Sequence, residues 1–294
     1  MKQTFDLVVV IPVGPAASPE FLIDNIESIV HYAKSSFKII LADDSHKGTA
    51  SVAQQQFLHL EIDIVPTPEP MGRLLGLYIT LCLAFKHAVK NYHFGALLKF
   101  DTDALIIGDH PAKEAIRLFK THPETGMAGQ YPNEYNGRLW DIGWPKQEII
   151  KICTTISFFR KPIPHWALLT AYRKALKNGY NTGESVFGGS YFMSEEALTR
   201  LNKTGRLPDR RLKTVNLEED HMFSILVMSV GLQLGDLSSG NLPMGCTWRG
   251  LPASPEELYQ RDKKIIHSTR YWKDMKEEEI RKYFKEKRVS AQPV

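Results

Sequence analysis

Residues 96–107 read Ala96-Leu-Leu-Lys-Phe-Asp-Thr-Asp-Ala-Leu-Ile-Ile107, an apolar run that ends at two aspartates and then resumes. The first five residues have the length and composition of a buried strand, and Asp101 and Asp103 leave its carboxyl end. At extended spacing, side chains at i and i+2 point to the same side. Ligands bind at the carboxyl ends of strands in open α/β sheets. The stretch therefore predicts an α/β fold with two carboxylates directed into a site.

The segments around this stretch alternate between strand and helix patterns, which predicts a sheet with helices on both faces. The continuous apolar run at residues 6–13 is typical of a central parallel strand buried on both sides. Further strands are expected at residues 37–42, 60–65, 126–130, 186–193 and 232–236. Helices are expected at residues 19–34, 73–91, 111–121, 166–177, 195–202, 220–230 and 275–287, and a loop at residues 131–146.

Composition excludes several classes of protein. The 294 residues are 43% hydrophobic and 24% charged, with a net charge of +4, which is too mild to predict a nucleic-acid partner. The longest near-apolar run, residues 74–85, is shorter than the ~20 residues of a transmembrane segment, and the amino terminus reads as a strand. Cys82, Cys153 and Cys246 are isolated, which favours reduced thiols and a cytoplasmic location over a disulfide framework or a zinc site.

Asp101 and Asp103 form the strongest candidate site. Two carboxylates on one side of a chain can hold a hard divalent cation, and such a cation can bridge a diphosphate. The alternative is a surface loop, because fourteen aspartates in this chain give roughly 0.7 chance Asp-x-Asp matches. The apolar frame around the pair favours the metal, since burying an unpaired charge is costly. Lys99, two residues earlier, is expected to pair with a carboxylate or a phosphate.

Three further patterns carry candidate residues. Asp44 ends the strand-like run Ile39-Ile-Leu-Ala-Asp-Asp-Ser45 and could bind a nucleotide base or cap a helix. Glu219 and Asp220 precede an apolar helix. One of them could serve as a general base or position an acceptor hydroxyl. Alternatively, both could simply stabilise the helix, because carboxylates interact favourably with the amino-terminal end of its dipole. His267 follows a short apolar pair and is either a structural residue or a ligand.

Two glycines and several tryptophans complete the candidates. Gly188 and Gly189 fall within a predicted strand, which indicates the close approach of a ligand or another part of the chain. Four tryptophans in the second half are candidates, of which Trp140 and Trp144 could stack on a sugar ring, and each could instead be an ordinary, partly buried aromatic. They are Trp140, Trp144, Trp166 and Trp248.

The order of these patterns resembles that of the metal-dependent GT-A glycosyltransferases, and the first half is closest to the broad family 2 type. The resemblance rests on VVVIPVGP, LADDS, Gly72-Arg73, FDTDALI, FGGSYF, EED before a helix and a late histidine, over residues 6–270. It implies an α/β, Rossmann-like GT-A domain with a mixed, mostly parallel sheet flanked by helices. Residues 1–130 would bind the nucleotide and residues 131–272 the acceptor. Beyond the resemblance, the mixed charges of residues 273–294 predict a helix with a solvated face, in preference to one that contacts a membrane, and a tail.

The resemblance also implies roles for individual residues. A nucleotide-binding set would contact the base, phosphates or sugar, and it comprises Pro12, Gly14, Asp44, Arg73, Asp101, Gly188 and Gly189. Asp103 and His267, with Asp101, would hold Mn2+ or Mg2+. Asp220 and Glu219 match the catalytic acids of the family, in either an inverting or a retaining reaction.

These roles predict the transfer of a sugar from a UDP- or GDP-type donor to a sugar, lipid or small-molecule acceptor. Two alternatives come from other classes. A sugar-nucleotide nucleotidyltransferase needs a glycine-rich loop with an arginine after the first strand, and VGPAASPE has no arginine. A non-catalytic module that binds sugar nucleotides or carbohydrates would lack turnover.

Overall fold

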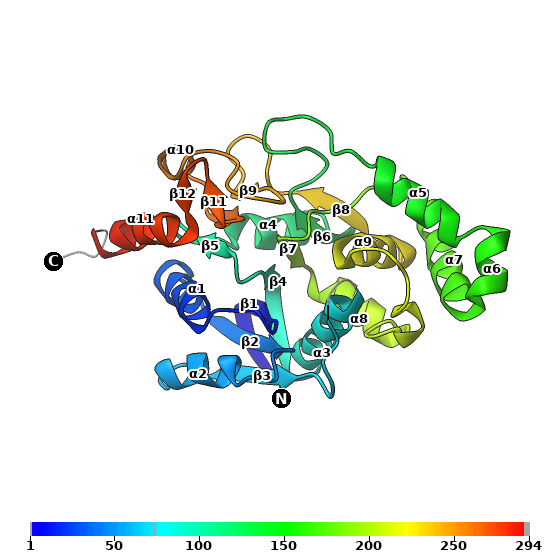
Figure 1. The fold of residues 1–294 in the computed structure, drawn as a ribbon, viewed down its shortest axis with the longest axis horizontal. Helices are drawn as coiled ribbons and strands as arrows, with labels where there is room; N and C mark the ends of the chain where they lie inside the picture. Colours follow the sequence, from blue (N-terminus) through cyan, green and yellow to red (C-terminus); the bar gives the residue numbers. More distant parts are fainter. Residues whose placement is uncertain (1, 73–74, 291–294) are drawn as a thin grey trace.

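A seven-stranded sheet lies at the centre of the molecule, in the order β3-β2-β1-β4-β7-β6-β8 (Figure 1). The computed structural model describes residues 2–72 and 75–290. The strands of this sheet are β1 (Gln3–Val13), β2 (Phe37–Asp43), β3 (Ile62–Pro66), β4 (Tyr92–Phe100), β6 (Thr125–Gly129), β7 (Ser190–Met193) and β8 (Gln233–Asp236). All neighbours are parallel except β7, which is antiparallel to both β4 and β6. The mixed, mostly parallel sheet predicted from the sequence is confirmed.

Two smaller sheets accompany the central one. A three-stranded sheet has the order β5-β10-β9, and a two-stranded sheet pairs β11 with β12. Their strands are β5 (Ala104–Ile106), β9 (Met244–Cys246), β10 (Ile265–His267), β11 (Tyr271–Trp272) and β12 (Met275–Lys276). Because β5 directly follows the stretch that begins in β4, the small sheet continues from the carboxyl end of the large one.

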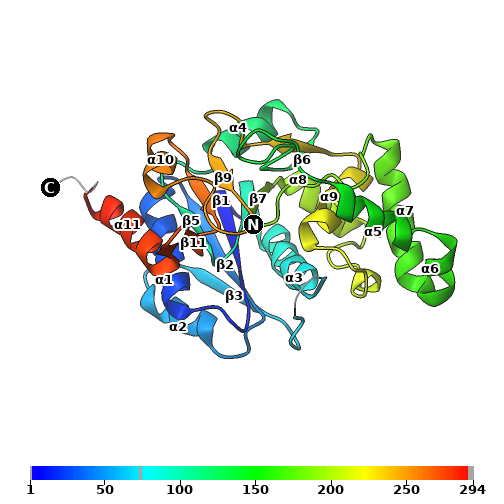
Figure 2. The same cartoon turned by 45° about the horizontal axis from the view of Figure 1, so that its top comes forward.

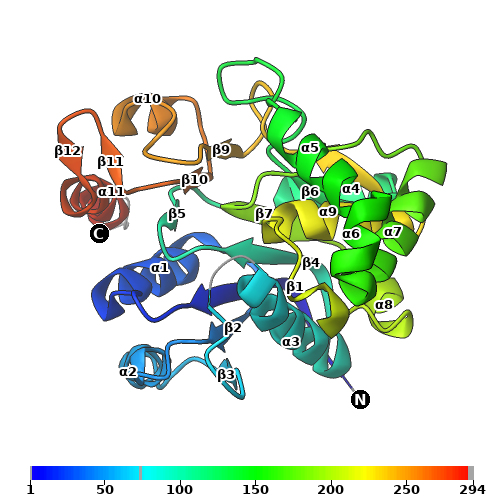
Figure 3. The same cartoon turned by 45° about the vertical axis from the view of Figure 1, so that its right-hand side comes forward.

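Helices cover both faces of the central sheet (Figures 2 and 3). They are α1 (Pro19–Tyr32), α2 (Thr49–Gln56), α3 (Leu75–Asn91), α4 (Lys113–Thr121), α5 (Gly143–Ile152), α6 (Thr155–Arg160), α7 (Pro162–Lys177), α8 (Glu195–Lys203), α9 (Glu219–Ser229), α10 (Pro255–Gln260) and α11 (Glu277–Ser290). A short 3-10 helix spans Arg210–Leu212. Within the described ranges, no helix is long and apolar enough to cross a bilayer.

Neighbouring residues of β1 face opposite sides of the sheet and enter two different hydrophobic cores. Leu7, Val9 and Ile11 pack with α1 and α2, whereas Val8 and Val10 pack with α3, α8 and α9. Successive side chains of a strand alternate between its faces, so a strand that is buried on both sides must be apolar throughout. The packing therefore explains the unbroken apolar run that the sequence shows.

Several helices of the structure were not predicted from the sequence. The loop expected at residues 131–146 ends early, because α5 begins at Gly143, and α2, α6 and α10 were not predicted. Helix α7 begins at Pro162, before the expected residue 166, since proline is well accommodated in the first turn of a helix. The three cysteines are free thiols, as expected.

The charged C-terminal helix has a buried face as well as the solvated face expected from the sequence. Ile280 and Phe284 of α11 are fully buried. Arg281 and Arg288 are also buried, and both form ion pairs with Asp24 of α1. Arg281 Nη1 lies 2.8 Å from Asp24 Oδ2. The helix is thus amphipathic, and its buried face holds it against α1.

Candidate active site

Asp101 and Asp103 lie in the turn that joins β4 to β5, at the carboxyl end of the central strand. The turn is closed by the backbone N–H of Ala104, which donates to the carbonyl oxygen of Asp101 at 3.0 Å. Strand β10 runs antiparallel to β5, and its register places His267 opposite Ala104. The pairing therefore brings together three residues that are up to 166 positions apart in sequence.

The three side chains converge on one point. His267 Nε2 lies 3.2 Å from Asp103 Oδ1 and 4.0 Å from Asp101 Oδ2. One ligand atom from each residue lies within 4.8 Å of the others. Carboxylate oxygen and imidazole nitrogen are common ligands of divalent metal ions in proteins.

A hydrogen bond sets the orientation of the His267 ring. Nδ1 lies 2.8 Å from the carbonyl oxygen of Thr247, and a carbonyl only accepts, so Nδ1 must carry a proton. Nε2 is then the atom that faces the two carboxylates. Two carboxylates and an imidazole nitrogen, all of them possible metal ligands, therefore face one another there. Ring orientation by a backbone carbonyl is typical of metal-binding histidines, so these residues fit a metal ion.

The two aspartates differ in electrostatic environment. Burial raises the pKa of Asp101 to about 6, against the opposing effect of the Lys99 ammonium. Burial also disfavours the charge of Asp103, but His267 and Arg270 outweigh it and hold the pKa of Asp103 well below its ordinary value. Arg270 Nε lies 2.8 Å from Asp103 Oδ2.

Lys99 connects the two acidic motifs. Its side chain is fully buried, and Nζ lies 2.6 Å from Asp101 and 3.2 Å from Glu219 Oε1. Nζ also donates to the carbonyl oxygen of Gly188 at 2.5 Å. Burial disfavours the ammonium, but the two carboxylates outweigh it and raise the pKa of Lys99 above its ordinary value. The expectation that Lys99 pairs with a carboxylate is confirmed.

Gly188 and Gly189 precede β7 instead of lying within it, so the predicted strand began too early. Both are close to site side chains. A Cβ atom on Gly189 would lie 2.4 Å from Nδ1 of His267, and one on Gly188 would lie 3.0 Å from Oδ2 of Asp220. The glycines thus leave room for a candidate ligand and a candidate base, which accounts for the close approach predicted from the sequence.

Asp220 and Glu219 begin α9 but point to different neighbours. Consecutive helical side chains are about 100° apart, so Glu219 faces Lys99 while Asp220 lines a cleft. Burial is the main cause that raises the pKa of Asp220, and the negative charge of Glu219 raises it further. Of these two acids, only Asp220 lines the cleft, the position required of a group that meets an acceptor.

The cleft has a volume of about 510 Å3 and is rich in aromatic and acidic side chains. Trp140, Trp144 and Trp248 line it, whereas Trp166 does not. Trp140 stacks on Phe187 with ring centroids 5.4 Å apart, and Phe187 lies edge-on to His267, also at 5.4 Å. A continuous column of rings therefore joins the cleft to the candidate metal site.

Asp44, directly after β2, holds the loop that follows β3. Its carboxylate accepts hydrogen bonds from the hydroxyl of Thr67 and the N–H of Met71, both at 2.7 Å, and from the N–H of Gly72 at 3.1 Å. Helix α2 begins after Gly48, so Asp44 is not its cap. The alternative that Asp44 is a helix cap is therefore wrong.

The other predicted nucleotide-binding residues lie at the same edge of the sheet. Pro12 and Gly14 stand at the carboxyl end of β1, between the parallel strands β2 and β4. A Cβ on Gly14 would meet open space, so this position adjoins solvent instead of packed side chains. Arg73 lies outside the described residues.

Comparisons with known proteins agree with this architecture. No protein-family model and no curated protein matches the sequence. Among solved structures, galactosyltransferase LgtC, in complex with donor and acceptor sugar analogs, matches with a TM-score of 0.51 at 11% identity. The match covers 98% of this chain and 97% of that one. The chain has the GT-A fold.

Two other solved structures match less closely. Mouse xyloside xylosyltransferase 1 has a TM-score of 0.46 at 10% identity, over 90% of this chain and 97% of that one. The mannosyltransferase PcManGT from Pyrobaculum calidifontis, in complex with GDP-Man and Mn2+, has a TM-score of 0.47 at 12% identity. That match covers 80% of this chain and 55% of the mannosyltransferase, so the chain spans about half the length of that protein.

Within this GT-A fold, two positioning residues were not identified from sequence. Arg270 pairs with Asp103, and Arg281 donates to the carbonyl oxygen of Thr102 at 2.7 Å and to Oδ1 of Asn25 at 2.9 Å. Arg270 lies three residues after the candidate histidine, which was a usable signal. Arg281 comes from the C-terminal helix, and no local pattern connects it to the site.

Proposed function

We propose that this chain is a metal-dependent glycosyltransferase that transfers a sugar from a UDP- or GDP-type donor to an acceptor hydroxyl. The observation that carries the proposal is the convergence of Asp101, Asp103 and the Nε2 atom of His267 at the carboxyl end of the sheet. The GT-A fold, shared with a galactosyltransferase that binds donor and acceptor sugar analogs, supports it.

Asp103 and His267, with Asp101, would hold Mn2+ or Mg2+. Carboxylates suit both ions, and the imidazole favours Mn2+. A bound ion would neutralise charge on the leaving diphosphate. In the nucleotide-binding half, residues 1–130, Pro12 and Gly14 would line the base, and Asp44 would contact it.

The remaining donor contacts follow from the same half and from the glycine pair. Arg73 would contact the phosphates or the base, and Asp101 would also reach the ribose or the transferred sugar. Gly188 and Gly189 would lie between donor and acceptor, where their lack of side chains keeps His267 and Asp220 in place.

The acceptor-binding half, residues 131–272, contains the cleft. Asp220 lines the cleft, so an acceptor bound there would have its hydroxyl beside this carboxyl group. In an inverting transfer Asp220 accepts the hydroxyl proton, and its raised pKa favours that role. In a retaining transfer it orients the acceptor. We also propose a cytoplasmic location, supported by three free thiols.

The glycine pair provides a matched prediction. Gly189→Ala is expected to displace the His267 ring and weaken Mn2+ affinity at least tenfold, since its Cβ would lie within 2.4 to 2.6 Å of three ring atoms. Gly188→Ala meets Asp220 instead, so it should spare Mn2+ affinity and slow transfer. Titration calorimetry with Mn2+ measures the first effect. Equal Mn2+ affinity in both variants would contradict the role given to His267.

Turnover of nucleotide sugars tests the proposal itself. A panel of UDP- and GDP-sugars is incubated with the protein, and release of nucleoside diphosphate is measured with Mn2+ and with EDTA. Water can replace an unknown acceptor in such an assay. Metal-dependent release from at least one donor is expected. Donor binding without release would favour the binding module, and release of pyrophosphate from a sugar phosphate and a nucleoside triphosphate would favour the nucleotidyltransferase.

A further inference from the structure

Helices α5, α6 and α7 form a corner at one end of the long axis of the molecule, opposite α11 (Figures 1 and 2). Large apolar side chains are exposed at this corner. Ile156 and Phe159 of α6 are 69% and 77% exposed, and Ile163 and Trp166 of α7 are 62% and 52% exposed. Phe158 links the two aromatic side chains of this group, with its ring 5.3 Å from Phe159 and 5.7 Å from Trp166. We call the four exposed residues the apolar tip. Contiguous exposed apolar surface marks an interaction site.

The same segment is strongly basic. Residues 143–177 contain seven Lys and Arg side chains and one acid, Glu148, although the whole chain has a net charge of only +4. Glu148 pairs with Lys151 at 3.2 Å, so the segment has no second acid for Arg160 and Lys161, which are exposed. We call Lys151, Arg160 and Lys161 the basic rim. The rim gives the corner an excess of positive charge.

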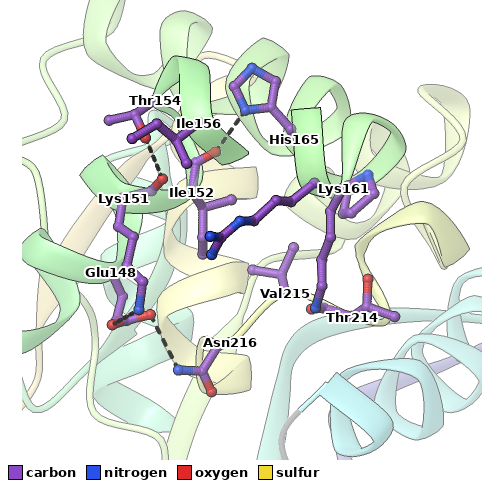
Figure 4. A pocket seen from close by; sticks show the side chains of 12 residues that line it. Glu148, Lys151, Ile152, Thr154, Ile156, Lys161, His165, Thr214, Val215 and Asn216 are labelled. Carbon is purple, nitrogen blue, oxygen red and sulfur yellow. Dashed lines mark hydrogen bonds and ion pairs between the residues drawn. The ribbon is translucent and has the colours of Figure 1, made fainter. Parts of the chain in front are cut away.

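A pocket of about 320 Å3 is lined by the whole basic rim and by Ile156 of the apolar tip (Figure 4). Ile152, Ile156 and Val215 give it apolar walls. Lys151 and Lys161 extend on opposite sides of these residues in Figure 4. An apolar wall between two ammonium groups matches an amphiphile with an anionic head and an apolar body.

We propose that the apolar tip, the basic rim and the pocket form a docking surface for a membrane that contains anionic phospholipids. Aromatic and aliphatic side chains would enter the interface between headgroups and acyl chains, while the rim pairs with lipid phosphates. A symmetric contact between two copies would place the basic rim against itself, which like charges disfavour. The charge of the corner therefore selects an anionic lipid surface over a second copy of the chain.

The position of the corner has a consequence for the active site. Trp144 and Pro145, near the start of α5, line the cleft, whereas Lys151 and Ile152, at its end, line the pocket. A ten-residue helix is about 15 Å long. Docking at the corner would thus hold the cleft close to the membrane surface, within reach of an acceptor anchored there.

Vesicle sedimentation tests the proposal with the full chain. The wild-type protein is expected to sediment with vesicles of phosphatidylcholine and phosphatidylglycerol, and not with phosphatidylcholine alone. Arg160→Gln with Lys161→Gln should weaken binding roughly 25-fold, since each basic residue near an anionic surface contributes about fivefold. Phe159→Ser with Ile163→Ser should weaken it at least tenfold, because both side chains would leave the interface.

Two matched control variants remove apolar or basic side chains from surfaces outside the corner. Leu58→Ser with Val289→Ser removes apolar side chains that are 84% and 65% exposed. Lys120→Gln with Lys282→Gln removes two exposed cations. Both controls should bind vesicles like the wild type, and circular dichroism should show all variants folded.

Three results would overturn the proposal. One is the absence of wild-type binding to anionic vesicles, and another is equal binding by corner and control variants. The third is a wild-type protein that is dimeric in light scattering and does not bind vesicles, while the corner variants are monomeric. That result would make the corner a self-association surface. Donor turnover is measured separately, so failure of the docking surface is distinguishable from failure of the proposed function.

Discussion

Asp220→Asn is expected to lower sugar transfer by about 100-fold or more while leaving donor affinity unchanged. Loss of general-base assistance has this magnitude. Asp220 lines the cleft, whereas the carboxylates of the candidate metal site belong to the turn between β4 and β5. Folding should be preserved, because Asn is nearly isosteric and tolerated near a helix start. The measurement is the turnover number beside the dissociation constant of the nucleotide.

Glu218→Gln is the matched control, since Glu218 lines the same cleft and undergoes the same loss of charge. We expect at most a few-fold effect there. Intact turnover in Asp220→Asn would refute the base assignment and direct attention to Glu219. Lost donor affinity would instead assign Asp220 to the donor site.

Lys99→Met should lower the free energy of unfolding by about 3–5 kcal/mol, the usual cost of removing one partner of a buried ion pair. The change leaves the carboxylates of Asp101 and Glu219 without their shared cation. Urea unfolding measures the loss. Mn2+ is expected to restore part of the stability, since a bound ion would supply a positive charge beside Asp101.

Lys38→Met provides the comparison for this prediction. Lys38 is also buried and pairs with Asp63 at 2.8 Å, but it lies on β2, outside the candidate site. Its loss should be smaller, because Asp63 keeps hydrogen bonds from Tyr92 and His87, and Mn2+ should not restore it. A loss below about 1 kcal/mol in Lys99→Met would contradict the central role of Lys99 in the site.

The features of the fold and of the candidate site that were predictable from the sequence are those that depend on contiguous residue patterns. The apolar run of β1 and the aspartates after β4 are contiguous signals, and the structure places both as expected. Lys99 and Asp101 are two residues apart, a spacing that puts their side chains on one side of an extended chain. Their contact was therefore within reach of sequence reasoning.

Contacts between distant segments were not predictable in the same way. The charges of the C-terminal helix predict a solvated face but do not show which of its residues are buried, and Arg281 is buried against Asp24 and Asn25 of α1. Short helices such as α6 were also not predicted, because six residues make fewer than two helical turns and show too little periodic pattern. The orientation of His267 depends on the carbonyl of Thr247, which only the pairing of β9 with β10 brings near.

Binding of Mn2+ together with a nucleoside diphosphate tests the metal site, on which the account depends. Titration calorimetry compares the wild type with Asp103→Ala and His267→Ala, using UDP and GDP with and without Mn2+. The account predicts Mn2+-dependent binding of at least one nucleotide to the wild type and at least tenfold weaker binding to each variant. Wild-type affinity in both variants, or nucleotide binding that does not depend on Mn2+, would contradict the proposed metal site.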